Sequence, residues 1–567
     1  MFDRYASSNE RGRSRTMVRG LLARMGRLVL LTGLVVIPVG AGAQRSGPVV
    51  TAPVGTMVGS ERRGILSFKG IPYAVAPEGD LRWKPPVPQP DWQDTRRATD
   101  FGPACYQPGA RSASVYSEDI GPMSEDCLSL NVWAPEHAEN APVLVWIHGG
   151  ALTNGASSQK TYDGSKMARQ GIVVVSINYR LGILGYLAHP ELSAESADDV
   201  SGNYGLLDQI EALKWVQRNI AAFGGDPANV TIAGESAGAL SVMYLMASPR
   251  ARGLFAKAIA ESAYMLSTPA LREASHGMPP AETTGSALQQ KLGAADLAAM
   301  RAMSPADLVR GAAEAAFVPW GTIDGQVLPD QLVDIFDRGE QAPVPIIAGF
   351  NSGEIRTLRI LLPPKPDSAA AYEARIRAAY GELADRFLAI YPSDDIEESM
   401  LATTRDAMYG WTSERLAAKQ AALGVPSYLY LFDHGYPATE TWNVHGFHGS
   451  ELPYVFGTMD DLPPYWPKIP DTARERAMSA AIMGYWVSFA RTGQPTAPNA
   501  PAWPPYADDR SGMVFANKPV PVLRLSGGRY ALHEEVVCRR RAAGDIPWTW
   551  NTGVISPPLP PQDTRCR

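Results

Sequence analysis

The chain has 567 residues, of which 45% are apolar and 19% are charged, and its formal net charge is −6. This composition predicts a globular protein and excludes intrinsic disorder. Because 52 basic residues stand against 58 acidic ones, no positive excess is available for nucleic acid, and we expect no nucleic-acid partner. Four cysteines exclude a disulfide-dense scaffold but leave room for one or two bridges.

The first 43 residues have the three parts of a secretory signal peptide. Seven arginines stand against two acidic residues before an apolar run at Leu28–Val39, and Ala41-Gly42-Ala43 follows as a small-residue cleavage site. The run is shorter than the ~20 residues of a membrane span. We therefore expect cleavage after Ala43, export to the periplasm or the medium, and no membrane association afterwards. Without residues 1–43 the net charge becomes −11.

The next part of the chain alternates between strand and helix patterns. Short apolar runs rich in β-branched residues predict buried strands at Val143–Ile147, Ile172–Ile177, Thr231–Ala233 and Val344–Ala348. Leu206–Ala222 has apolar residues at helical spacing. This alternation predicts an α/β fold with a mainly parallel sheet.

Residues 366–423 read as mostly helical and Ala-rich, and a strand is expected at Tyr428–Phe432. There is no internal repeat and no flexible linker rich in Gly and Ser. We therefore expect one large domain over residues 44–555, followed by a loose C-terminal tail at 556–567.

The strongest motif is Gly234-Glu-Ser-Ala-Gly238, which follows the expected strand at Thr231–Ala233 and precedes an apolar helical stretch. The G-x-S-x-G pattern places a serine on a tight strand-to-helix turn with its hydroxyl exposed. Glycines are needed on both sides because side chains there would collide across the turn. The pattern predicts Ser236 as a nucleophile.

A second glycine motif, His148-Gly-Gly-Ala151, follows the expected strand at Val143–Ile147. A loop of this kind can point backbone N–H groups at a developing oxyanion. Alone it could equally be an ordinary glycine turn. Together with the turn at Ser236, this loop is expected to provide the remaining N–H donors of an oxyanion hole.

Together with further motifs, these residues make the sequence resemble the type-B carboxylesterase family, the cholinesterase-like branch of the α/β-hydrolases. The resemblance extends over roughly residues 54–525. It implies an α/β-hydrolase fold: a mostly parallel central sheet flanked by helices, with long helical insertions around an active-site gorge. The other motifs that carry it are Phe68–Ala74, Ser124–Asn131, Asn178–Gly182, Gly202–Asp208, Phe223–Pro227 and Trp486–Gly493.

The resemblance also implies the partners of Ser236, in the order Ser, acid, His that this fold uses. His448, in His448-Gly-Ser-Glu-Leu452, resembles the family's general base, and His445 is the weaker alternative. Glu354, at the end of Gly349–Glu354, resembles the acid that orients the histidine. Asp324 and Asp433 are the other acids that the order allows.

The family's oxyanion donors correspond to the N–H groups of Gly150, Ala151 and Ala237. Ala151 departs from the commonest form, which has a third glycine, and its methyl group occupies space near the acyl group. Ser262 resembles a serine that hydrogen-bonds near the triad, or is simply a polar residue that ends a strand.

The resemblance implies a disulfide between Cys105 and Cys127. Whether Cys538 and Cys566 pair or remain free thiols stays open. No cofactor or metal is implied, since G-x-G-x-x-G, P-loop and H-E-x-x-H patterns are absent from the sequence.

These residues predict a serine hydrolase that cleaves a small-molecule carboxylic ester through an acyl-enzyme. A non-catalytic cholinesterase-like binding protein is the alternative from another class, and a carbamate, thioester or amide hydrolase would use the same groups. Arg356 and Arg359 follow Glu354 closely and could face an acidic substrate, although structural ion pairs are the simpler interpretation.

Overall fold

The computed structural model describes residues 47–109, 113–548 and 552–566. The signal peptide expected at residues 1–43 lies outside the described residues. Among the helices that are described, none is both long enough and apolar enough to cross a membrane.

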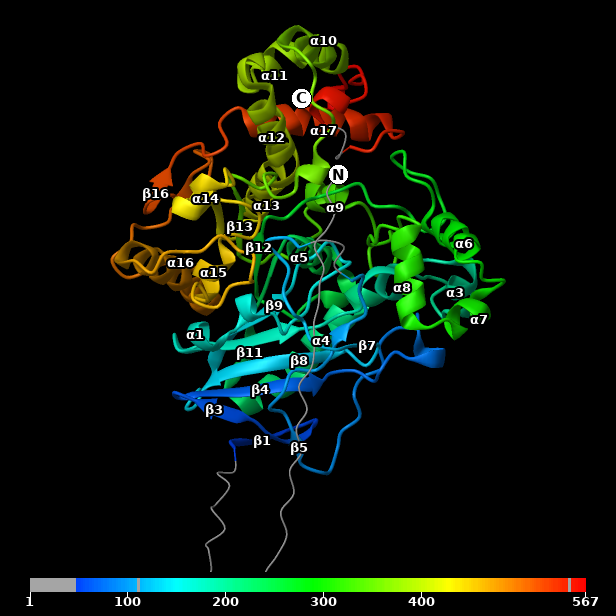
Figure 1. Cartoon of the computed structure of the whole chain (residues 1–567), viewed down its shortest axis with the longest axis vertical. Helices are drawn as coiled ribbons and strands as arrows, with labels where there is room; N and C mark the ends of the chain where they lie inside the picture. Colours follow the sequence, from blue (N-terminus) through cyan, green and yellow to red (C-terminus); the bar gives the residue numbers. More distant parts are fainter. Residues whose placement is uncertain (1–46, 110–112, 549–551, 567) are drawn as a thin grey trace, which may run out of the picture. The chain divides into compact units, whose positions relative to one another are not determined.

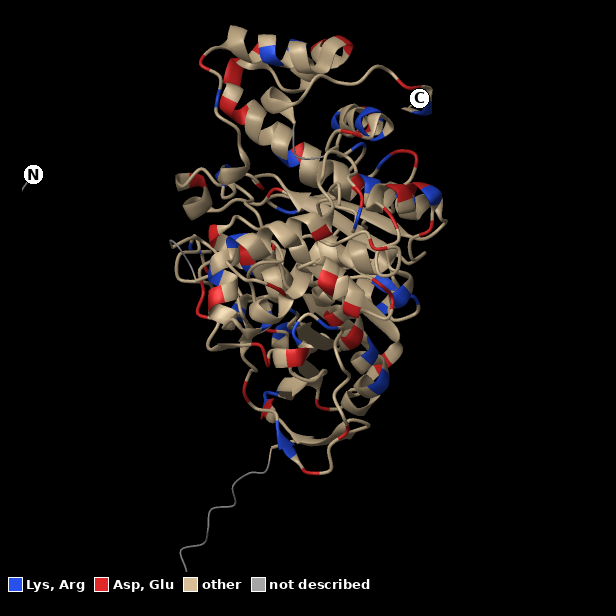
Figure 2. Ribbon diagram, turned by 90° about the vertical axis from the view of Figure 1, so that its right-hand side faces the viewer, with Lys and Arg blue, Asp and Glu red and all other residues tan. Residues whose placement is uncertain are grey.

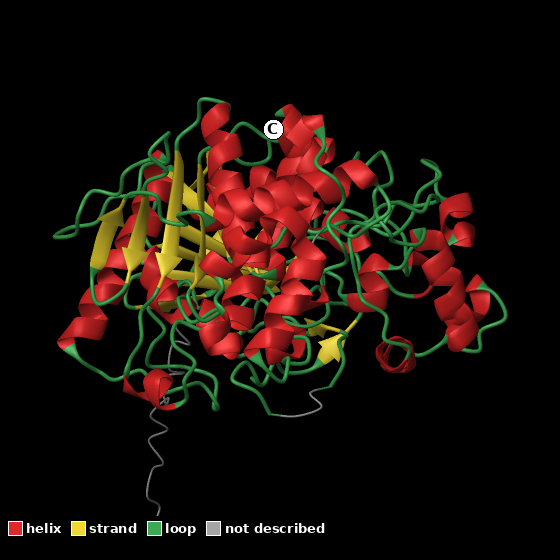
Figure 3. Ribbon diagram, turned by 90° about the horizontal axis from the view of Figure 1, so that it is seen from above, coloured by secondary structure: helices red, strands yellow, loops and turns green. Residues whose placement is uncertain are grey.

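The central element of the described chain is one sheet of eleven strands. Its strands are β3 (Ser60–Arg62), β4 (Ile65–Pro72), β8 (Ser129–Pro135), β9 (Ala141–Ile147), β10 (Val173–Ile177), β11 (Gly225–Glu235), β12 (Lys257–Glu261), β13 (Ile346–Asn351), β14 (Ser427–Phe432), β15 (Gly512–Phe515) and β16 (Pro519–Val522). They run in the order β16-β15-β14-β13-β12-β11-β9-β10-β8-β4-β3. Figure 3 shows the strands in yellow with helices packed beside them. The stretch from β15 to β10 is parallel, and the strands at both edges are antiparallel. This confirms the expected α/β class.

Smaller strands lie outside this sheet. They are β1 (Val49–Ala52), β2 (Gly55–Val58) and β5 (Arg96–Arg97) in one sheet, and β6 (Ala104–Cys105) and β7 (Met123–Ser124) in another. The helices near the first half of the sheet are α1 (Ser165–Ala168), α2 (Gly182–Tyr186), α3 (Pro190–Glu195), α4 (Tyr204–Asn219) and α5 (Ala237–Ala247).

Long helical insertions follow β12 and β13, as expected. The first holds α6 (Ala281–Lys291), α7 (Leu297–Ala302), α8 (Pro305–Glu314) and α9 (Leu332–Arg338). The second holds α10 (Ala369–Tyr380), α11 (Ala384–Ile390), α12 (Ile396–Arg405) and α13 (Trp411–Ala422). Later helices are α14 (Pro437–Thr441), α15 (Leu452–Phe456), α16 (Ala473–Thr492) and α17 (Arg529–Ala543). Figure 1 shows α10, α11 and α12 close to α17, and their side chains share one apolar cluster.

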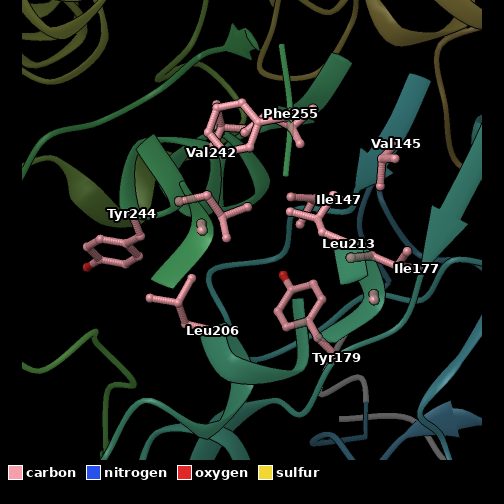
Figure 4. Packing of buried hydrophobic residues seen from close by; sticks show 14 of the residues in the cluster. Val145, Ile147, Ile177, Tyr179, Leu206, Leu213, Val242, Tyr244 and Phe255 are labelled. Atoms are coloured by element: carbon pink, nitrogen blue, oxygen red, sulfur yellow. The ribbon is translucent and has the colours of Figure 1, made fainter. Parts of the chain in front are cut away.

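Alternate side chains of β9 pack on opposite faces of the sheet. Val143, Val145 and Ile147 belong to a cluster with residues of α4 and α5 (Figure 4). Leu144 and Trp146 belong to a second cluster with residues of α16. Both faces of this strand are buried, so side chains at successive positions are all apolar, and this explains the uninterrupted apolar run in the sequence.

The strands expected from such runs are present with shifted bounds: β9 begins two residues before its run, whereas β10 and β13 begin one and two residues after theirs. The strand expected at Thr231–Ala233 is the end of β11, which begins at Gly225. The strands β3, β4, β8, β15 and β16 were not expected as sheet members. The strand β15 is four residues long and contains Gly512, so it forms no unbroken β-branched run.

A buried ion pair joins two of the sequence motifs. The Arg180 guanidinium donates to both carboxylate oxygens of Asp208, at 2.8 and 2.7 Å, and both side chains are almost fully buried. Most other ion pairs are exposed, and Figure 2 shows basic and acidic residues interspersed over the described chain. The Arg180–Asp208 pair holds the chain after β10 against α4.

Both pairs of cysteines form disulfides, Cys105–Cys127 and Cys538–Cys566. The second bridge answers the question that the sequence left open. The segment expected as a loose tail is tied down within its described part, since Leu559 N also donates to Ala379 O on α10. Within the described residues, this segment therefore contacts α17 through the disulfide and α10 through a backbone hydrogen bond.

We expect Asp208→Asn to lower the free energy of unfolding by about 3–5 kcal/mol, because it leaves the Arg180 charge buried without its partner. Urea unfolding followed by circular dichroism measures the change. Asp91→Asn is the matched control, since Asp91 pairs with Arg218 at the surface and its loss costs about 1 kcal/mol or less. Equal losses in the two variants would contradict this role for the buried pair.

Candidate active site

Ser236 lies on the turn between β11 and α5. Its backbone has φ 57° and ψ −121°, a conformation that costs energy for any residue with a side chain. The neighbouring glycines make the turn possible. A Cβ atom on Gly238 would lie 2.0 Å from Ile147 O, and one on Gly234 would lie 2.5 Å from the Gly238 carbonyl carbon. The turn thus presents the Ser236 side chain at the carboxyl end of the sheet.

Glu354 and His448 meet beside this turn. His448 Nδ1 lies 2.5 Å from Glu354 Oε2, and both residues are buried. The other oxygen, Oε1, accepts from Asn351 N at 2.7 Å and from Ser262 Oγ at 2.6 Å. Glu354 is therefore held by three donors, and one of them is Ser262, which follows β12.

The alternatives that the sequence left open lie elsewhere. His445 Nε2 is 3.0 Å from Asn443 Oδ1 in an exposed loop. Asp324 Oδ1 accepts from three successive backbone N–H groups, at residues 326, 327 and 328, so it closes a turn. Asp433 is exposed. Ser236 and His448 line one pocket, together with Gly150 and Ala151.

The glycine loop after β9 has the conformation expected of a donor loop. Gly150 has φ 105°, and a Cβ atom there would lie 2.1 Å from Asn154 O. Ala151 has φ 56°, which is a strained, left-handed conformation for alanine. Ala237 is the first residue of α5, so its N–H has no partner within the helix. These three N–H groups lie on the two turns that flank the pocket.

The pocket has a volume of about 740 Å³ and a largely aromatic and apolar wall. Among the lining residues within the described part of the chain, which excludes residues 110–112, the charged side chains are those of Glu118, Glu235 and His448, and no Lys or Arg is found. Arg356 and Arg359 do not line it; they pair with Glu398 and Glu397. The structural interpretation of these two arginines is therefore confirmed.

The sequence reasoning missed a group of buried carboxyl groups around His448. Glu235 Oε1 lies 3.1 Å from His448 Nε2. Glu451 accepts from Asn351 Nδ2, and Glu261 accepts from Trp486 Nε1 at 2.9 Å. The signal was present, since Glu235 and Glu451 stand inside the serine and histidine motifs, but nothing in the sequence shows that they are buried.

Burial and mutual repulsion change the pKa values of this group. Burial, with a smaller contribution from the charge of Glu354, raises the pKa of Glu235 to about 7 against the attraction of His448. Burial also raises the pKa of Glu261 to about 8 and that of Glu451 well above its usual range. For His448, burial lowers the pKa, but Glu235 and Glu354 outweigh it and raise the pKa to about 9. The imidazole is thus held strongly by the two carboxylates.

His148 has a different environment from His448. Its ring stacks on Tyr179, with centroids 4.6 Å apart, and Nδ1 lies 2.9 Å from Gly149 O. Burial lowers the pKa of His148 to about 4, although the Gly149 contact opposes this. The ring is therefore neutral near pH 7 and supports the donor loop.

Two tyrosines from distant segments also contact His448. Tyr116 donates its hydroxyl hydrogen bond to His448 O at 2.9 Å. The Tyr409 ring lies 5.3 Å from the His448 ring, and it belongs to a π-helical turn, Asp406–Gly410, between α12 and α13. Such turns are frequent at functional sites. Neither residue stands in a motif, so the sequence did not identify them.

A comparison with known protein families identifies the class of protein to which the chain belongs. The model of the carboxylesterase family matches residues 46–524, so the chain belongs to the carboxylesterase family. It is 36% identical to the para-nitrobenzyl esterase of Bacillus subtilis, over 84% of this chain and 96% of that protein. It is 35% identical to the fumonisin B1 esterase of Sphingopyxis macrogoltabida, over 86% and 90% of the two chains. It is 33% identical to human cocaine esterase, over 85% and 90%.

Solved structures agree with this assignment. A PNB esterase superposes with a TM-score of 0.73 at 33% identity, covering 86% of this chain and 99% of the other. A carboxylesterase of Geobacillus stearothermophilus gives a TM-score of 0.73 at 32% identity, over 85% and 99%. The fold is therefore the α/β-hydrolase fold, and the protein is an enzyme of the esterase class, as the sequence predicted.

We expect Glu235→Gln to lower the pKa of His448 by about 1–2 units, because it removes a negative charge that stabilises the imidazolium. A general base, the role that the sequence predicts for His448, works when it is unprotonated, so the acidic limb of the kcat/KM profile moves to lower pH. The profile with p-nitrophenyl acetate measures the shift.

Glu118→Gln is the control for this variant, since Glu118 lines the same pocket but accepts from Lys160 N instead of facing His448. An unchanged profile in Glu235→Gln, or an equal shift in both variants, would contradict the electrostatic coupling.

Proposed function

We propose that the protein is an exported serine carboxylesterase that hydrolyses small carboxylic esters through an acyl-enzyme on Ser236. The observation that carries the proposal is the chain of contacts from Ser262 through Glu354 to His448, beside a serine on a strained turn. The family membership supports ester hydrolysis, and the pocket geometry supports the choice of residues.

In this mechanism Ser236 Oγ attacks the ester carbonyl while His448 takes its proton. Glu354 keeps the His448 ring oriented, with its Nδ1–H toward the carboxylate. The N–H groups of Gly150, Ala151 and Ala237 stabilise the oxyanion. His448 then protonates the departing alcohol, and water hydrolyses the acyl-enzyme by the same route.

The buried carboxylates beside His448 match the charge changes that occur during this mechanism. Proton transfer from Ser236 creates an imidazolium between Glu235 and Glu354, 3.1 and 2.5 Å away. Opposite charges at such distances stabilise the imidazolium in a site sheltered from water. The same attraction that raises the His448 pKa therefore lowers the energy of the tetrahedral intermediate.

Treatment with a fluorophosphonate tests the role of Ser236. We expect one phosphonyl adduct on Ser236 by peptide mass spectrometry, with loss of hydrolysis of p-nitrophenyl acetate and of a para-nitrobenzyl ester. Ser236→Ala is expected to lose activity by on the order of 10⁴-fold or more without a change in folding.

Ser267→Ala is the control for this test, since Ser267 is also buried but does not line the pocket. Absence of both the adduct and ester hydrolysis in the wild-type protein would favour a non-catalytic binding protein. Hydrolysis of carbamates or amides in preference to esters would favour the related enzyme classes.

Export is a separate part of the proposal, and it rests on residues 1–43. We expect the full chain, expressed in a Gram-negative host, to be recovered from the periplasm or the medium with Gln44 as its first residue. Intact-mass measurement decides this. Replacing the apolar run Leu28–Val39 with polar residues is expected to retain the precursor in the cytoplasm. A mature protein that keeps residues 1–43 would contradict the cleavage.

A further inference from the structure

A second cavity adjoins the active-site pocket. It has a volume of about 420 Å³ and lies between α6 and the segment 315–322. Val318 and Trp320 line both cavities. Because the same two side chains bound the two spaces, a ligand that passes over them can occupy both. We call the second cavity the outer groove.

The lining of the outer groove is mostly apolar, with three threonines, one tyrosine and one charged side chain, that of Lys291 at the end of α6. Leu288 forms part of its floor and is buried, whereas Thr284 and Ala287 on the same face of α6 are exposed. On the other side Ala315 and Ala316 leave space that larger residues would fill. The groove therefore suits a hydrocarbon chain or an apolar ring system better than a charged group.

Large apolar side chains are exposed where the groove and the pocket meet solvent. Val318 is 53% exposed and lies between the two cavities, and Ile360 is 92% exposed at the wall of the pocket. Met123 lines the same pocket and is 39% exposed. Exposed apolar residues that gather at a cavity indicate binding of apolar surface, since covering them removes them from water.

We propose that the outer groove binds the far end of a long, uncharged arm of the ester substrate whose carbonyl group lies at Ser236. The inference rests on the proposed function of Ser236 and adds the substrate class. The natural substrate is then an ester with an extended apolar arm that leaves the pocket over Val318 and Trp320. Among the described residues that line the two cavities, Lys291 at the end of α6 is the single Lys or Arg, so most of the path offers a carboxylate on this arm no cationic partner.

Filling the outer groove from its exposed side tests the proposal. Ala287→Trp places an indole in the groove without altering any residue of the pocket. We expect kcat/KM for p-nitrophenyl dodecanoate or for dodecyl acetate to fall by about tenfold or more, the effect of losing burial for roughly two methylene groups. The value for p-nitrophenyl acetate is expected to stay within about twofold. The two long esters distinguish an acyl arm from an alcohol arm.

Gln290→Trp is the matched control, because Gln290 is exposed on α6 but does not line the groove. It is expected to keep the wild-type values with all three esters. Thermal melting checks that both variants fold. Unchanged values of Ala287→Trp with both long esters, or an equal loss with p-nitrophenyl acetate, would overturn the proposal.

A binding measurement separates this proposal from the proposed function. In Ser236→Ala protein, calorimetric titration with dodecyl acetate is expected to give a Kd that Ala287→Trp raises about tenfold. If the wild-type protein hydrolyses no ester but this difference in Kd remains, the catalytic proposal fails and the groove stands. If hydrolysis is normal and the Kd is unchanged, the groove proposal fails alone.

Discussion

The site depends on the close approach of the Ser236 turn to the end of β9. With Gly238 against the carbonyl of Ile147, no side chain fits between helix α5 and the strand. A wider separation would move Ser236 and Ala237 away from the Gly150–Ala151 loop, which continues from the same strand. The proposed nucleophile and the proposed oxyanion donors are therefore positioned by the pairing of β9 with β11. Since β12 and β13 run parallel to them, Ser262 and Glu354 emerge at the same edge of the sheet.

The charges around His448 form the second constraint. Glu235 and Glu354 contact the imidazole, and Glu261 and Glu451 are buried in the same region. Ionisation of all these groups would leave several negative charges without partners in a medium that solvates them poorly. Burial raises the pKa values of Glu235, Glu261 and Glu451, so these three keep protons that isolated carboxyl groups would lose, and each titration depends on the others. Asn351 links two of its members, since its backbone N–H donates to Glu354 and its side chain to Glu451. The Trp486 contact with Glu261 connects the cluster to α16, on the opposite face of the sheet from α5.

The sequence predicts those structural features of this molecule that depend on neighbouring residues in the chain. A strand buried on both faces leaves an apolar run, and the Ser236 turn requires its two glycines, so both are visible without a structure. The pocket wall is different, because it depends on contacts between distant segments. Tyr116 and Tyr409 are 293 residues apart and both reach His448. No periodicity in the sequence indicates that two such distant residues contact the same histidine. Burial of Glu235 was also invisible, since its charge would ordinarily place it at the surface. The resemblance to a family located Glu354 and His448, whose spacing alone left alternatives open.

The Cys105–Cys127 disulfide closes a loop that supplies Gln107, Tyr116 and Met123 to the pocket wall. A cross-linked loop has fewer detached conformations than an open one, so less entropy is gained when it leaves the pocket. The hydrogen bond from Tyr116 to the His448 carbonyl fixes the middle of the same loop. The described residues of this loop, 105–109 and 113–127, are held by these two links, so a ligand that contacts them bears less of the entropy cost of ordering the wall. Selectivity on this side of the pocket then depends on the shape that these residues have before binding.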